Sequence, residues 1–293
     1  MHSLNIKLTY QCSNHCDFCF SKYLQNEIIE LDEIKKSVID GAQNGCQALV
    51  ISGGEPTLFP SHIIEIIDLA ESLGFKHYTI QTNGIGLCRK KKLLEYLSLL
   101  SKNKEVFISF SVHGSNSDIH DQLSSQRGAF SKTLAAIENI YKYTDCKIMT
   151  NTVISRDNYF DLVNIYFLLA SFKPIVTQFS ILHTDNNNLS LGLIDSSILV
   201  KELATIIPKE ILRTEGIPYC LMRGIEKCVG ESYWPERLDL FNKKDDYISD
   251  FNQLDIGMRY KASFCKQCIM NNICSGTWLE NKNELLENCK PIC

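Results

Sequence analysis

Residues 4–19 read LNIKLTYQCSNHCDFC, a short alternating stretch followed directly by three closely spaced cysteines. Apolar and polar side chains alternate over residues 4–9, which predicts a strand with one buried face. Cys12, Cys16 and Cys19 follow with the spacing C-x3-C-x2-C. Functional groups that come directly after a strand are typical of the carboxyl edge of a parallel sheet. The stretch therefore predicts a metal or redox site at the end of a strand.

The same alternation of strand-like and helix-like segments continues to about residue 185. Further strands are predicted at residues 48–52, 78–82, 106–112, 147–154 and 175–182. Helices are predicted at residues 31–44, 61–73, 89–101, 130–143, 158–170 and 195–206. Strands separated by helices pair in parallel through right-handed crossovers. Six such strands predict an α/β fold, a partial (β/α)6 barrel.

Composition sets the broad class. The 293 residues are 44% apolar and 22% charged, which is typical of a globular protein. The net charge of −4 does not favour a nucleic-acid partner. No apolar run is long enough to span a membrane and no signal peptide is visible, so a cytoplasmic location is expected. The length suits a barrel over residues 1–190, a linker and helix over 191–215, and a small cysteine-rich cluster-binding domain over 216–293.

Thirteen cysteines are more than packing requires. In a chain of this length, clustered cysteines indicate metal binding or redox chemistry rather than a disulfide framework. Three thiolates on one loop suit an iron–sulfur cluster that keeps one open iron, and a zinc site completed by His15 is the alternative. Cys46, Cys88 and Cys146 stand alone among apolar residues and are expected to be packing residues.

A second motif follows the second predicted strand. Residues 52–56 read SGGEP, a tight turn in which glycines allow close backbone approach. This motif after C-x3-C-x2-C resembles the radical S-adenosylmethionine (SAM) superfamily. The resemblance implies that Cys12, Cys16 and Cys19 hold a [4Fe–4S] cluster. It also implies that residues 53–55 (Gly53, Gly54 and Glu55) receive the methionine amino group of SAM, whose cleavage yields a 5′-deoxyadenosyl radical.

Later strand ends extend the resemblance. Phe18 matches a usual aromatic position beside the adenine, and Asn83 closes the third strand within Thr-Asn-Gly. Ser111 suits either a ribose contact or a structural strand end. Arg127 suits either the SAM carboxylate or a surface salt bridge. His113 departs from the family pattern, and either a structural role or a place near the substrate is open to it.

The C-terminal region carries a second cysteine motif. Cys265, Cys268 and Cys274 have the spacing C-x2-C-x5-C, which resembles the SPASM and Twitch auxiliary-cluster domains of radical SAM enzymes. The full SPASM form continues with a cysteine where this chain has Trp278. Cys220 is the first choice as fourth ligand of an auxiliary [4Fe–4S] cluster, with Cys228, Cys289 and Cys293 as rivals. A zinc ribbon is the alternative.

The resemblance implies a radical SAM enzyme with at least one auxiliary cluster. Relatives of this architecture commonly modify ribosomally made peptides by cross-linking, thioether formation or epimerisation, so a peptide substrate is the first expectation. A dehydrogenase or other enzyme acting on a small-molecule metabolite is the alternative. A non-catalytic metal-binding or electron-transfer protein is a remote alternative. The electron donor is expected to be a flavodoxin or a ferredoxin.

Overall fold

The computed structural model describes residues 1–19, 21–89, 91–183, 188–242, 246–248 and 258–292. Its main sheet contains the strands β1 (His2–Thr9), β2 (Ala48–Gly53), β3 (His77–Thr82), β4 (Glu105–Ser111), β5 (Lys147–Ile154), β6 (Val176–Ile181), β7 (Leu212–Glu215), β8 (Arg237–Asn242) and β9 (Asp246–Ile248). The helices are α1 (Leu31–Gln43), α2 (Pro60–Ser72), α3 (Lys91–Leu100), α4 (Ser117–Leu123), α5 (Ala129–Tyr143), α6 (Leu162–Ala170), α7 (Leu193–Leu203) and α9 (Lys282–Asn288).

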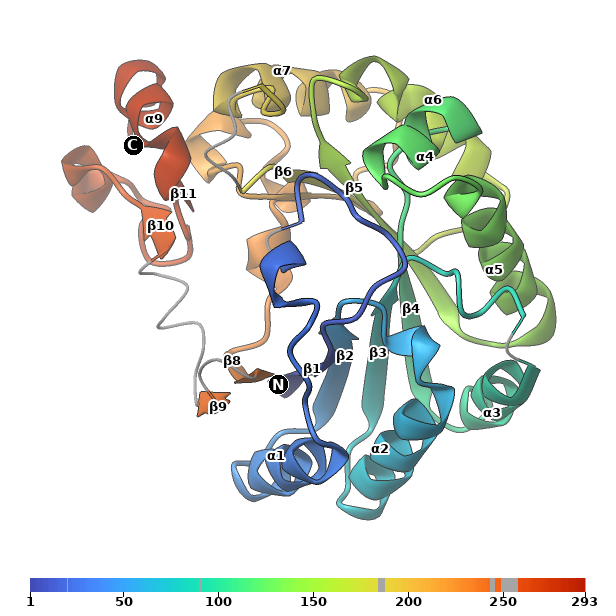
Figure 1. Cartoon of the computed structure of the whole chain (residues 1–293). Coiled ribbons are helices and arrows are strands. Elements are labelled where there is room, and N and C mark those ends of the chain that lie inside the picture. The colour runs from blue at the N-terminus through green and yellow to red at the C-terminus, as the bar shows by residue number, and fades with distance from the viewer. Residues whose placement is uncertain (20, 90, 184–187, 243–245, 249–257, 293) are drawn as a thin grey trace.

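The six predicted strands are confirmed as β1 to β6, each paired in parallel with its neighbour. The strand order in the described residues is β7-β6-β5-β4-β3-β2-β1-β8-β9. Figure 1 shows the sheet curved, with helices along its outer side and the segment between β1 and α1 passing over its inner side. This arrangement confirms the partial (β/α) barrel.

Strands from beyond residue 190 extend the sheet at both edges. β7 pairs in parallel with β6, and β8 pairs in parallel with β1. β9 then pairs antiparallel with β8. β7 lies in the residues expected to be a linker, and β8 and β9 lie in those expected to form the C-terminal domain. The sequence analysis missed β7 because four residues are too few to show an alternating pattern.

Two faces of each strand meet different surroundings. Leu4 and Ile6 of β1 are fully buried and join Ile34 and Val38 of α1 in the hydrophobic core. Burying each such side chain contributes about 1.5–3 kcal/mol, which holds the sheet in one register. The opposite, inner face carries polar side chains from successive strands, namely Asn5, Lys7, Ser52, Ser109, Ser111, Asn151, Gln178, Ser180 and Glu215.

The C-terminal cysteine motif lies in a small separate layer. A two-stranded antiparallel sheet joins β10 (Arg259–Tyr260) to β11 (Thr277–Trp278), and α9 follows. Figure 1 shows this layer beside α7 and the adjacent end of the main sheet. The carboxylate of Glu284 in α9 accepts a hydrogen bond from the N–H of Ile194 at 3.0 Å, which attaches the layer to α7. Within the described residues, no helix is long and apolar enough to cross a membrane.

Candidate active site

The three N-terminal cysteines lie on the loop after β1. Cys12, Cys16 and Cys19 are each half-buried. The N–H of Cys19 donates to the carbonyl oxygen of Cys16 at 3.0 Å, and the N–H of His15 donates to that of Ser124 at 2.9 Å. The second bond attaches the loop to the end of α4. The loop therefore reaches from β1 to the segment that follows β4.

The second predicted motif lies directly against the segment that leads into the cysteines. The N–H of Gly54 donates to the carbonyl oxygen of Thr9 at 2.6 Å, and that of Glu55 donates to Gln11 at 2.8 Å. A Cβ on Gly54 would stand 2.3 Å from the carbonyl oxygen of Gln11, so a side chain does not fit. Gly53 has φ of +123°, a conformation that favours glycine. Both glycines are required for this contact.

The carboxylate of Glu55 is fully buried and hydrogen-bonded within the protein. Its Oε1 accepts the N–H of Thr57 at 3.0 Å and the hydroxyl of Thr82 at 2.6 Å. Its Oε2 accepts the N–H of Asn83 at 2.6 Å. Burial raises the pKa of this carboxyl, and the donors act in the opposite direction. The side chain joins the ends of β2 and β3.

Asn83 connects that junction to the first cysteine. Its side-chain amide donates to the Sγ of Cys12 at 3.6 Å. Its Oδ1 accepts the N–H of Ile85 at 3.0 Å, and its carbonyl oxygen accepts the hydroxyl of Thr133 at 2.6 Å. Asn83 is therefore locked in one orientation, with its amide directed at the thiol.

The surroundings of the triad fit a cationic cluster. Burial raises the pKa of Cys12 to about 11 and that of Cys16 to about 12, and the neighbouring thiols add to both shifts. Ligation by iron stabilises the deprotonated form that burial disfavours. Ser13 Oγ and Asn14 Oδ1, between the first two cysteines, are buried without a hydrogen-bond partner among the described residues. The three thiols and these polar atoms fit a [4Fe–4S] cluster.

A site for one metal ion requires side chains that converge more closely than the ligands of a cubane do. In the part of the chain that the structure describes, no three His, Cys, Asp or Glu side chains converge as one metal ion requires. A cubane presents a separate iron to each thiolate, so its ligands need not converge in that way. His15, the nitrogen ligand of the zinc alternative, is exposed.

Phe18 lies edge-on against His113, with ring centroids 4.9 Å apart and an interplanar angle of 76°. The Nδ1 of His113 accepts the N–H of Val153 at 3.4 Å, and the N–H of His113 donates to the Nδ1 of His120 at 3.2 Å. Burial lowers the pKa of His113 to about 3 and that of His120 to about 4. Both imidazoles are neutral packing groups, and His113 supports the ring of Phe18.

The other predicted SAM contacts lie apart from one another. Ser111 ends β4 on the inner face, in register with Asn151 of β5. Arg127 is exposed on the loop between α4 and α5, in a surface hollow that it shares with Asp118 and Asp121. The structure thus groups Ser111 with the inner face and places Arg127 outside it.

Four C-terminal cysteines line one pocket. Cys220, Cys265, Cys268 and Cys274 all contribute to its wall, and each is half-buried. Its other lining residues include Pro218, Tyr219, Phe264, Leu285 and Pro291. The structure therefore brings together the four residues that the sequence analysis assigned to an auxiliary cluster.

The rival cysteines differ in position. The neighbouring thiol of Cys289 raises the pKa of Cys220, so Cys289 lies next to the pocket. Cys228 is fully buried in the hydrophobic core and does not line the pocket. Cys293 lies outside the described residues. Sequence spacing did not distinguish Cys289 from Cys228, because each lies fourteen or more residues away from the C-x2-C-x5-C run, on opposite sides of it.

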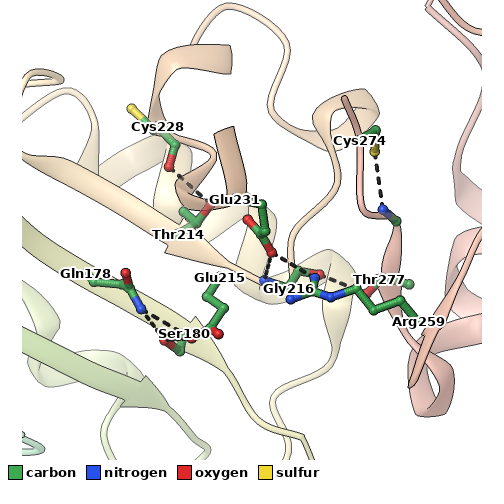
Figure 2. Close-up of polar contacts among 11 residues, drawn as sticks. Gln178, Ser180, Thr214, Glu215, Gly216, Cys228, Glu231, Arg259, Cys274 and Thr277 are labelled. Carbon is green, nitrogen blue, oxygen red and sulfur yellow. Dashed lines mark hydrogen bonds and ion pairs between the residues drawn. The ribbon is translucent and has the colours of Figure 1, made fainter. Parts of the chain in front are cut away.

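A buried ion pair between Arg259 of β10 and Glu231 lies beside the residue that follows β7, as Figure 2 shows. The Oε1 of Glu231 accepts the N–H of Gly216 at 2.7 Å and the Nη1 of Arg259 at 2.8 Å. The hydroxyl of Thr277 donates to the carbonyl oxygen of Gly216 at 2.8 Å. The guanidinium lies 3.8 Å from the ring centroid of Trp278. This group of five residues, the clamp, was not predicted, because its members carry no local motif.

The end of β7 adds a carboxylate to the inner face (Figure 2). The Oε2 of Glu215 accepts the hydroxyl of Ser180 at 2.8 Å and the side-chain amide of Gln178 at 3.2 Å. The hydroxyl of Ser180 also lies 2.8 Å from the Oδ1 of Asn151. Glu215 directly precedes Gly216, so the clamp fixes its position.

Comparison with curated proteins finds several enzymes. An AdoMet-dependent heme synthase from Methanosarcina barkeri is 28% identical over 172 residues, which span 58% of this chain and 47% of that protein. A GTP 3′,8-cyclase from Clostridium perfringens is 26% identical over 284 residues, spanning 91% of this chain and 80% of the cyclase. The subtilosin biosynthesis protein AlbA from Bacillus subtilis is 29% identical over 135 residues, 45% of this chain and 29% of AlbA.

Solved structures share the fold over nearly the whole chain. Streptococcus suis SuiB bound to S-adenosylmethionine superposes with a TM-score of 0.68 at 19% identity, covering 99% of this chain and 75% of SuiB. SuiB bound to the precursor peptide SuiA gives 0.66 at 18% identity, covering 99% and 73%. The enzyme anSMEcpe with bound AdoMet gives 0.66 at 17% identity, covering 97% and 92%.

The family model of the Radical SAM superfamily matches residues 6–169, which is more than half of the chain. The match includes the cysteine triad, the 53–55 strip, Asn83 and the ends of β1 to β5. The chain belongs to the radical SAM superfamily.

Proposed function

We propose that this radical SAM enzyme removes a hydrogen atom from a peptide and so introduces a cross-link, a thioether or an epimerised residue. The family's cofactors are a [4Fe–4S] cluster and SAM. Residues 1–190 form the barrel that holds them, 191–215 the connection, and 216–293 the auxiliary-cluster domain. β7 and β8 extend the barrel sheet from the second and third of these segments.

The observation that carries the peptide assignment is the C-terminal pocket with its four thiols. A second cysteine site on a radical SAM barrel is the mark of the SPASM and Twitch enzymes, whose members commonly modify ribosomal peptides. The structural likeness to SuiB and anSMEcpe extends over this C-terminal layer as well as the barrel. In the structure of SuiB with SuiA, that enzyme binds a precursor peptide.

Cys12, Cys16 and Cys19 hold the first cluster in this proposal. When bound, it supplies the electron that cleaves SAM to methionine and a 5′-deoxyadenosyl radical, which takes a hydrogen atom from the substrate. The amide of Asn83 donates to the thiolate of Cys12 and orients it. The contacts of Gly53 and Gly54 with residues 9–11 keep the SAM strip beside the triad.

The remaining SAM contacts come from the cysteine loop and from β4. Phe18, supported by His113, lies beside the adenine, and Ser111 contacts the ribose from the end of β4. Arg127 lies on an exposed loop outside the inner face, so its position favours the surface role over contact with the SAM carboxylate. The polar inner face, including Glu215, surrounds the substrate and excludes bulk water from the radical.

Cys220, Cys265, Cys268 and Cys274 hold an auxiliary [4Fe–4S] cluster. Formation of a cross-link or thioether removes two hydrogen atoms from the peptide; the radical takes one, and the other leaves as a proton and an electron. An auxiliary cluster held by these four cysteines would accept that electron. A flavodoxin or ferredoxin supplies the electron that starts the reaction.

One observation favours a second candidate, an enzyme that acts on a nucleotide or another small metabolite. The GTP 3′,8-cyclase is similar over 91% of this chain, which is more than the barrel residues alone account for. The C-x2-C-x5-C spacing resembles the auxiliary domains of peptide maturases more closely than that of such a cyclase. The peptide assignment is therefore placed first.

The test uses anaerobically reconstituted protein with SAM and a strong reductant. The assay supplies either short peptides encoded beside the gene or GTP, and mass spectrometry follows both substrate and 5′-deoxyadenosine. A peptide that loses two hydrogen atoms, or gains solvent deuterium in heavy water, supports the proposal. Conversion of GTP with no change in any peptide supports the second candidate. No 5′-deoxyadenosine with either substrate contradicts both.

A further inference from the structure

Lys7 is an isolated cation on the inner face of the sheet. It lies on β1 in register with Ser52 of β2, and it is partly buried. Its Nζ donates to the Oγ of Ser52 at 2.9 Å, and that hydroxyl donates to the Oδ1 of Asn5 at 2.7 Å. An ammonium carries three donors, and the hydroxyl accepts one of them.

Among the residues that the structure describes, no carboxylate neutralises this ammonium. Within the described ranges of the chain, Lys7 forms no ion pair, and Ser52 is its hydrogen-bond acceptor. The carboxylate on the same face, Glu215, accepts hydrogen bonds from Ser180 and Gln178 on the neighbouring strand β6. A half-buried charge without a counter-ion is costly, and here burial lowers the pKa of Lys7 to about 8.

The ammonium of Lys7 lies near the residues proposed to bind SAM and the first cluster. Ser52 directly precedes Gly53, the first residue of the strip proposed to receive SAM. Lys7 itself lies five residues before Cys12 on the strand that leads into the triad. A molecule that occupies the inner face beside this strip meets the two remaining N–H donors.

We propose that Lys7 binds an anionic oxygen group, a carboxylate or a phosphate, of a molecule that enters the barrel. The inference rests on the proposed function in that it uses the same site, and it adds one chemical feature of the ligand. Two molecules can supply the group: the substrate, or SAM through its methionine carboxylate. A residue kept only for packing would be better served by methionine, which has similar length and no charge to desolvate.

The experiment compares the reconstituted wild-type holoenzyme with Lys7→Met. Lys35→Met is the matched control, because Lys35 forms a solvent-exposed ion pair with Glu65 between α1 and α2. Calorimetry measures binding of SAM and of decarboxylated SAM. It then measures binding of inorganic phosphate and of acetate in the presence of saturating SAM. Thermal unfolding of each variant is recorded beside these titrations.

Because a charge-assisted hydrogen bond is lost, we expect Lys7→Met to lower the affinity for the anion by about tenfold or more. Lys35→Met should leave that affinity unchanged. If the variant binds SAM more weakly but binds decarboxylated SAM as the wild type does, the anion is the SAM carboxylate. If SAM binds normally and phosphate or acetate binding is lost, the anion belongs to the substrate. In either case Lys7→Met unfolds at the same temperature as the wild type or higher, because a buried charge has been removed.

Unchanged binding of all four ligands in a folded Lys7→Met protein overturns the inference. If that variant does not fold, the binding measurements on the wild-type protein test the inference instead. Equal affinity for SAM and decarboxylated SAM, with no binding of phosphate or acetate, also overturns it. Formation of 5′-deoxyadenosine at saturating SAM is measured separately, so failure of the proposed function is distinguished from failure of this inference.

Discussion

The side-chain amide of Asn83 donates a hydrogen bond to the Sγ of Cys12 across 3.6 Å, linking the end of β3 to the first cysteine of the triad. The same residue donates its backbone N–H to the buried carboxylate of Glu55. The turns after β2 and β3 and the cysteine loop therefore form one hydrogen-bonded unit.

Asn83→Ala removes a donor to a cluster sulfur. Hydrogen bonds to cluster sulfurs raise the reduction potential, because they stabilise the more negative reduced state. A loss of about 1 kcal/mol corresponds to a shift of roughly 50 mV for one electron. We expect a lower potential of the SAM cluster with iron content unchanged, measured by redox titration with electron paramagnetic resonance in the absence of SAM. The exposed Asn103→Ala is the control, and equal potentials in all three proteins would contradict the contact.

Glu55→Gln places an amide among groups that all donate. The glutamine oxygen replaces one acceptor, and its NH2 group faces the N–H of Thr57 or of Asn83. We expect the free energy of unfolding to fall by about 2–4 kcal/mol, measured by denaturant titration. Glu65→Gln, which removes an exposed carboxylate, is expected to leave the free energy of unfolding nearly unchanged. Similar free energies of unfolding for the two variants would show that the hydrogen bonds of Glu55 do not stabilise the ends of β2 and β3.

Stability is expected to fall in acid because of two buried histidines. The pKa values of His113 and His120 lie at about 3 and about 4, below the ordinary 6.5. Below pH 6.5 the unfolded chain binds protons that the folded imidazoles do not, so the free energy of unfolding decreases as pH falls. The slope is roughly 1.4 kcal/mol per pH unit for each histidine.

The matching measurement is denaturant titration between pH 7.5 and 5 on the wild type, His120→Phe and the surface variant His62→Phe. The difference between proteins removes contributions that they share, such as acid release of iron. His120→Phe should flatten the slope and His62→Phe should not. Parallel slopes for all three proteins would count against neutral, buried imidazoles.

Arg259→Met leaves the carboxylate of Glu231 buried without its cation. Breaking a buried pair in this way costs about 3–5 kcal/mol. The clamp holds Gly216 and Thr277, which lie four residues before Cys220 and three after Cys274. We therefore expect preferential loss of the auxiliary cluster.

Iron analysis checks this expectation. Arg259→Met should lower the iron content from about eight atoms per chain to about four, one cubane's worth, with 5′-deoxyadenosine formation still detectable. Arg156→Met is the control, because its guanidinium is exposed and bonds the carbonyl oxygen of Ser190. Full iron content in Arg259→Met would mean that the clamp does not position the pocket.

The main features of the fold could be predicted because hydrophobic periodicity is local. Strand β1 and helix α1 each show their buried face within a dozen residues. The pairing of β8 with β1 could not be predicted, since more than 200 residues separate His2 from Arg237 and no periodic pattern names a partner. α4 was also missed; it has seven residues, and its start depends on a side-chain cap from Asn116 to the N–H of Ile119.

Some residues of the candidate site could likewise be predicted from the sequence, and others could not. The triad and the 53–55 strip are contiguous motifs, so their residue types and spacing reveal them. The clamp joins Gly216, Glu231 and Arg259 through burial and charge, which sequence spacing does not encode. Lys7 is one of the polar residues of an alternating strand, and the alternation alone does not show what that face lines. The curvature of the sheet turns that face into the lining of the barrel.

The central claim is that Cys12, Cys16 and Cys19 hold the cluster that cleaves SAM. The most direct measurement is 5′-deoxyadenosine formation by the reconstituted wild type and by the triple variant Cys12→Ala, Cys16→Ala, Cys19→Ala, with SAM and a strong reductant under anaerobic conditions. The account predicts formation in the wild type, none in the variant, and about four irons retained by the variant in the C-terminal pocket. Continued 5′-deoxyadenosine formation by the variant would contradict it.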